Sequence, residues 1–138
     1  MNTYDADHDP DPRAWLGLDE DTKIDLVVKY HRRQRRRTPR VRLHATFHTI
    51  VENQAAASEP VVVETLKRLR NEGLSRHDAV HAIVSVLAAQ VYDVLKHEHP
   101  ETGKHPNEAY AAELRQLTAA SGPSPELPRL EGGSRLAL

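Results

Sequence analysis

Two stretches decide the fold of this chain: Leu43-His44-Ala45-Thr46-Phe47-His48-Thr49-Ile50-Val51-Glu52, and Arg76-His77-Asp78-Ala79-Val80-His81. Each places two histidines four positions apart, and residues four apart lie on the same face of a helix. The same helical spacing continues through apolar positions, from His81 to Val84, Ala88, Val91 and Leu95, and from His48 to Val51 and Ala55. We therefore predict two amphipathic helices whose histidines point into the core.

The rest of the chain follows the same helical period between clear boundary signals. We predict helices over residues 19–36, 40–57, 60–72 and 75–96, and a shorter, weaker one over 107–120. Asp19 is a good N-cap, Gly73 a helix stop, and Ser75 with Asp78 a capping box. No stretch has the alternation of a strand. The prediction is an all-α protein with an antiparallel four-helix bundle-like core and a short fifth helix.

Composition sets the domain organisation. The 138 residues suffice for one domain, which we place at residues 14–120, between a disordered acidic arm (1–13) and a flexible tail (121–138). The absence of cysteine excludes disulfides and thiolate metal ligands. The acidic start differs from a signal peptide, and no apolar stretch approaches the length that spans a bilayer. We expect a cytoplasmic protein without membrane contact.

The paired histidines point to metal chemistry. Two histidines one helical turn apart can chelate one cation, so the predicted ligands are His44, His48, Glu52, His77 and His81. Imidazole and carboxylate ligands suit a divalent transition metal such as Zn, Fe or Mn, and two neighbouring pairs can hold two ions. The alternative is a set of hydrogen-bonded histidines in the core or at a dimer interface.

The role of such a metal depends on whether its coordination is closed. A site closed by four or five protein ligands would be structural or sensory, which we favour slightly. An open position would hold an acidic water, and Glu52 would then be the catalytic general base of a metal-dependent hydrolase. A redox metal would instead make the protein an oxidoreductase. Whether the protein is an enzyme stays open at this point.

A run of arginines suggests a function of a different class. It extends from Arg32 to Arg42, and its candidate phosphate-binding members are Arg32, Arg33, Arg35, Arg36 and Arg37. Such a run can bind nucleic acid or another protein, although the net charge of the chain is only -1. The simpler interpretation is a solvated helix end. The consecutive valines Val61, Val62 and Val63 are a weak indication of a homodimer.

Two resemblances extend this interpretation. The motifs Leu43-His44-Ala45…His48…Val51-Glu52-Asn53-Gln54 and Arg76-His77-Asp78-Ala79-Val80-His81-Ala82-Ile83 resemble a family of small helical bacterial proteins known as a domain of unknown function. The resemblance covers about residues 13–96 and implies no activity. In addition, His48-x3-Glu52 followed by His77-x3-His81 is similar to the central ligands of hemerythrin-like di-iron bundles. That likeness implies His31 as a further ligand, but the chain lacks the final His-x4-Asp of those proteins.

Overall fold

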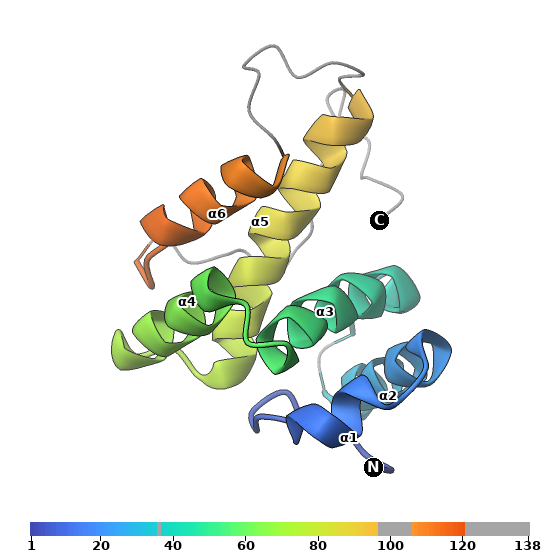
Figure 1. Cartoon of the computed structure of the whole chain (residues 1–138). Helices are drawn as coiled ribbons and strands as arrows, with labels where there is room; N and C mark the ends of the chain where they lie inside the picture. The colour runs from blue at the N-terminus through green and yellow to red at the C-terminus, as the bar shows by residue number, and fades with distance from the viewer. Residues whose placement is uncertain (36, 97–105, 121–138) are drawn as a thin grey trace.

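The computed structural model describes residues 1–35, 37–96 and 106–120, which form an all-helical protein (Figure 1). The helices are α1 (Pro12–Leu16), α2 (Glu20–Arg33), α3 (Val41–Ala56), α4 (Pro60–Asn71), α5 (Arg76–Lys96) and α6 (Pro106–Gln116). The predicted all-α class with a helical core is confirmed. The short α1 was not predicted, and the tail expected at 121–138 lies outside the described residues.

The helix boundaries follow the local signals in the sequence. The side chain of Asp19 accepts a hydrogen bond from the amide of Thr22 (2.7 Å) and so caps α2. Gly73 has a φ of 110°, a left-handed conformation that suits glycine, just after the end of α4. Ser75 Oγ accepts from the amide of Asp78 (3.1 Å) at the start of α5. Each boundary therefore has a local cause.

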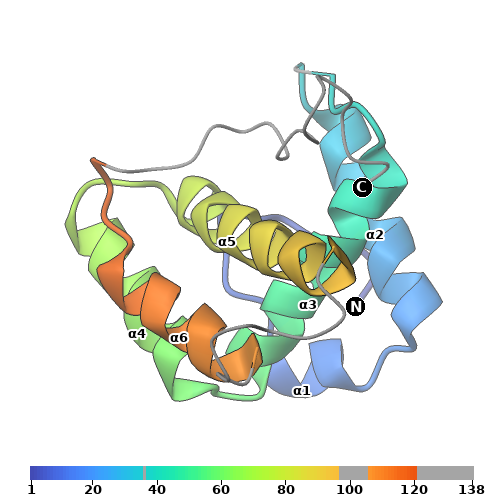
Figure 2. The same cartoon turned by 90° about the horizontal axis from the view of Figure 1, so that it is seen from above.

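Helix α3 is the centre of the molecule. It packs against α1, α2, α4 and α5, while α6 packs on α4 and α5. Figure 2 shows α2 on one side of α3 and α5, and α4 with α6 on the other. One apolar cluster joins α3, α4, α5 and α6 through residues such as Phe47 and Leu69, and a second surrounds Trp15 and Val27. Helix α3 contributes to both, so its histidine face lies between them.

The predicted disorder of the acidic arm is wrong. Tyr4 and Ala6 are buried with relative exposures of 1% and 0%, and the Tyr4 ring packs on Trp15. The carboxylate of Asp7 accepts a hydrogen bond from the amide of His77 (3.1 Å), in the first turn of α5. Acidic groups are favourable at a helix N-terminus, because its amides are unpaired and carry partial positive charge. The arm is therefore held by one aromatic anchor and by a helix end.

Helix α5 is long and apolar. Within the described residues, it is the one helix whose length and composition would allow it to cross a membrane. The prediction that no apolar stretch approaches this length is therefore wrong for α5. A core helix can have the same composition, and the first half of α5 is a core helix, with Ala79, Val80, Ile83 and Val84 buried.

Candidate metal centre

Histidines from three helices converge between α2, α3 and α5. His31 of α2, His44 and His48 of α3, and His81 of α5 each offer a ring nitrogen, and these nitrogens all lie within 4.8 Å of one another. His31, His44 and His48 are buried, whereas His81 is half-buried. A fifth ring joins them, because Nε2 of His77 lies 3.0 Å from Nε2 of His81. We call these five residues the histidine cluster.

Two of the separations between ring nitrogens match those expected around a single cation. Nε2 of His81 lies 3.1 Å from Nε2 of His44 and 3.0 Å from Nε2 of His77. Ligand nitrogens about 2.1 Å from an ion would be about 3.0 Å apart at a right angle and about 3.4 Å apart in a tetrahedron. A neutral imidazole nitrogen is either a donor or an acceptor. Hydrogen bonds therefore satisfy the three Nε2 atoms poorly, whereas one cation can accept a lone pair from each.

Two further nitrogens are buried without a partner. Nε2 of His31 and Nε2 of His48 have no hydrogen bond among the described residues. Nδ1 of His31 donates to the carbonyl oxygen of Val27 (2.9 Å), which fixes the tautomer and leaves the lone pair on Nε2. An unsatisfied polar atom in the core is costly. Buried ring nitrogens without a hydrogen-bond partner are expected where histidines are metal ligands.

Burial keeps the histidine cluster uncharged at neutral pH. It is the leading cause of the lowered pKa values of all five rings. The pKa falls to about 3 for His44 and to about 2 for His81, where the neighbouring histidines add to the effect. The pKa of fully buried His48 lies well below its ordinary value. Neutral imidazole is the form that binds metals, so these ligands need no deprotonation at pH 7.

A buried relay of hydrogen bonds stands behind His48. The hydroxyl of Tyr4 donates its proton to the carboxylate of Glu52. Its oxygen, 3.3 Å from Nδ1 of His48, can then only accept, so that nitrogen carries the proton. This leaves the lone pair of His48 on Nε2. Carboxylate groups behind metal-bound histidines fix tautomers in this way.

Glu52 is held by an arginine rather than by the histidines. Nη1 and Nη2 of Arg76 donate to its two carboxylate oxygens, both at 2.8 Å, and both residues are buried. Burial lowers the pKa of Arg76, but hydrogen bonding and charge attraction to Glu52 more than offset this, and the net shift is upward. The residue predicted as a ligand or general base thus lies one side chain behind the cluster. His44, His48 and His81 are gathered as expected, with His77 at their edge.

Sequence reasoning gave too little weight to His31 and missed Tyr4. His31 entered only through the hemerythrin likeness, yet it follows Ile24, Val27 and Val28 at core spacing on α2, a signal that was available. Tyr4 lies in a polar, acidic segment without helical period, and only its aromatic character distinguishes it there. The relay from Tyr4 to Glu52 spans 48 residues of sequence, so no local pattern predicts it.

Some residues of the arginine run form contacts within the protein. Arg33 donates to the carbonyl oxygen of Tyr4 (3.1 Å), and Arg42 forms an ion pair with Asp25 (2.9 Å). Arg32, Arg35 and Arg37 are exposed, and Arg36 lies outside the described residues. Its binding of nucleic acid, like dimer formation through the valines, stays a prediction. Of those valines, Val62 is buried and Val63 is 41% exposed.

No protein-family model matches this chain, and neither a curated protein nor a solved structure is significantly similar to it. The likenesses to the bacterial family and to hemerythrin therefore stay predictions. The chain is a small helical protein with a histidine cluster that can hold a metal ion.

Proposed function

We propose that this protein binds one divalent transition-metal ion through the histidine cluster, with His31, His44, His48 and His81 as ligands and His77 at a fifth position. The observation that carries the proposal is the pair of buried, unpartnered Nε2 atoms on His31 and His48, beside the Nε2 atoms of His44 and His81. Four neutral imidazoles that converge in this way form a ligand set typical of a transition-metal site. Their burial without an ion is unfavourable.

The donor set favours Zn or Fe over Mn, and one ion over two. Imidazole nitrogen suits Zn, Cu, Fe and Ni, whereas Mn prefers carboxylate and water. Dinuclear sites in helical bundles are built with several inward carboxylates. The carboxylate of Glu52 is taken by Arg76 and Tyr4, and no other Asp or Glu of the described residues belongs to the group. A single ion bound by histidines alone is therefore the interpretation that agrees with these contacts.

The same contacts favour a structural or sensory role over hydrolysis. A hydrolase needs an open position and a base next to the metal-bound water. Glu52, the predicted base, is 1% exposed and has both oxygens engaged by Arg76. Meanwhile α2 packs on α3, and His31 reaches His81 of α5 across the cluster. The ion would join these helices, so its binding would be coupled to the stability of the fold.

Thermal unfolding of chelator-treated protein tests the proposal. We expect Zn²⁺, or Fe²⁺ without oxygen, to raise the melting temperature of the wild type and of a His8→Gln control. His8 is an exposed histidine outside the cluster. The double variant His48→Gln/His81→Gln should lose the rise. No rise in the wild type, or an equal rise in the double variant, would overturn the proposal.

A further inference from the structure

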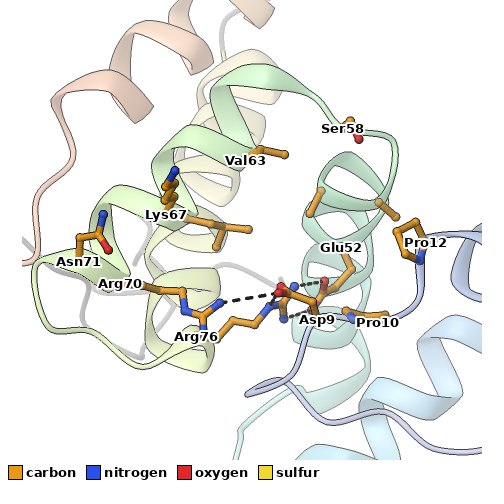
Figure 3. Close-up of a pocket in the computed structure, with 13 residues that line it drawn as sticks. Asp9, Pro10, Pro12, Glu52, Ser58, Val63, Lys67, Arg70, Asn71 and Arg76 are labelled. Atoms are coloured by element: carbon orange, nitrogen blue, oxygen red, sulfur yellow. Dashed lines mark hydrogen bonds and ion pairs between the residues drawn. The ribbon is translucent and has the colours of Figure 1, made fainter.

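A cavity of about 760 Å³ is lined by Glu52 and by none of the residues of the histidine cluster. It is bounded by the N-terminal segment, the end of α3 and one face of α4. Figure 3 shows Val63 and Lys67 of α4 on one wall, and Glu52 with Pro12 across from them. Small-molecule sites commonly have volumes of about 300–1,000 Å³. The cavity is therefore of a size that takes a small ligand.

The polar side of this cavity is rich in cations. Lys67, Arg70 and Arg76 line it, and they face only two carboxylates, Asp9 and Glu52. Both carboxylate oxygens of Glu52 accept hydrogen bonds from Arg76. This leaves Asp9 to balance Arg70, Lys67 and the remaining edge of Arg76. The cavity thus has more positive charge than its own acids neutralise.

Asp9 occupies the position that a ligand carboxylate would take. Its carboxylate lies 2.5 Å from Nε of Arg76 and 3.8 Å from Nη1 of Arg70, as the dashed lines in Figure 3 mark. Its side chain is nevertheless 72% exposed, whereas that of Arg76 is 2% exposed. The pair with Arg70 joins two exposed side chains and contributes little to stability. A competing carboxylate can make the same contacts with Arg70 and Arg76 and so take the place of Asp9.

The other side of the cavity is apolar. Val63 is a large hydrophobic residue that remains 41% exposed on α4, and Leu66, Ala55 and Ala56 also line the cavity. Apolar surface beside a few convergent polar groups is typical of small-molecule sites. The complementary ligand has an acidic group at one end and a short apolar body at the other.

We propose that this cavity binds a small amphipathic carboxylate, whose carboxylate displaces Asp9 from Arg70 and Arg76 while its apolar body lies against Val63 and Leu66. Arginine forks are suited to carboxylates, and Lys67 adds a third cation near the opening. This site is distinct from the metal centre, because it uses none of the five histidines. The two sites meet only at the pair of Arg76 and Glu52.

Titration calorimetry of the full chain with hexanoate and with benzoate tests this site, with 1-hexanol and benzyl alcohol as neutral analogues at equal ionic strength. We expect at least one of the acids to bind, and its alcohol to bind about tenfold more weakly or not at all, as the loss of a charge-assisted contact implies. Binding of neither acid, or equal binding of acid and alcohol, would overturn the proposal.

Two variants with opposite expected effects on affinity test which residues bind the carboxylate. Lys67→Ala/Arg70→Ala should weaken binding by about tenfold or more, whereas Asp9→Asn should strengthen it several-fold, because asparagine keeps the shape but not the competing charge. Lys29→Ala/Arg13→Ala removes two exposed cations elsewhere and should change nothing. An unchanged affinity in the Lys67/Arg70 variant, or weaker binding in Asp9→Asn, would contradict the displacement of Asp9.

Discussion

Nε2 of His44 on α3 lies 3.1 Å from Nε2 of His81 on α5. Both rings are uncharged at neutral pH, because burial lowers their pKa values. One of these nitrogens can donate to the other, but His77 approaches His81 at the same time (3.0 Å). The arrangement satisfies all three only when a cation accepts their lone pairs.

The metal-free protein should lose stability as the pH falls. Because the histidine pKa values are lowered in the folded state, the unfolded chain binds more protons below about pH 6.5. The free energy of unfolding therefore falls on acidification from about pH 6.5 toward pH 3, by up to about 1.4 kcal/mol per pH unit for each buried histidine. Above about pH 7 this contribution is flat.

Urea unfolding of chelator-treated protein between pH 4.5 and 8 measures this dependence. The double variant His48→Gln/His81→Gln should show a shallower decline, because two of the titrating groups are gone. The same pH dependence in both proteins would contradict the assignment of these two histidines as buried and neutral.

Tyr4→Phe should weaken metal binding without removing any ligand. Without the hydroxyl, Nδ1 of His48 loses its acceptor, and the tautomer that presents Nε2 is no longer favoured. Removal of a group behind a ligand commonly lowers metal affinity by about 10- to 100-fold. Competition with a chromophoric chelator measures the affinity. Tyr110→Phe is the matched control, because its hydroxyl donates to Gln54 (2.8 Å) away from the cluster. Equal affinities in the two variants would show that the relay has no role.

Arg76→Met should destabilise the fold strongly. It leaves the buried carboxylate of Glu52 without its cation, which commonly costs about 3–5 kcal/mol. The matched control is Arg70→Met, whose side chain is 46% exposed and lies 3.8 Å from Asp9, and which should cost no more than about 1 kcal/mol. The double variant Arg76→Met/Glu52→Gln should recover part of the loss in urea unfolding. Similar costs for Arg76→Met and Arg70→Met would be inconsistent with a buried pair.

Deletion of residues 1–9 should expose the only tryptophan of the chain. Trp15 is 0% exposed, and its ring lies 5.5 Å from that of Tyr4. Its fluorescence emission should therefore shift to longer wavelength, while circular dichroism should keep the helical signal of the core. Asp5→Ala, at an exposed position of the same segment, should leave the emission unchanged. An unshifted emission in a folded deletion variant would mean that the segment does not cover Trp15.

The helices were predictable because their signals are local. The apolar period, the cap at Asp19 and the glycine after α4 act within a few residues, and the structure follows each of them. The convergence of His44, His48 and His81 was predictable for the same reason, because each pair lies on one buried helical face. Glu52 lies one turn after His48, but its hydrogen-bond partners are Arg76, 24 residues away, and Tyr4, 48 residues away. Spacing within one helix does not predict these contacts.

Long-range contacts account for what the sequence could not reveal. The N-terminal segment has the composition of a disordered arm, but Tyr4 is buried against the rings of Trp15 and Tyr30, which lie later in the sequence. The excess of cations around Lys67 and Arg70 also arises only when α4, α3 and this segment come together. No periodicity or spacing within one helix carries that information.

Elemental analysis of purified, untagged protein measures directly whether the histidine cluster holds a metal ion. We expect close to one transition-metal ion per chain in the wild type and in His8→Gln, and almost none in His48→Gln/His81→Gln. A wild type that carries no metal and takes up none after incubation with Zn²⁺ or Fe²⁺ would contradict this expectation, and so would a double variant that retains a full ion.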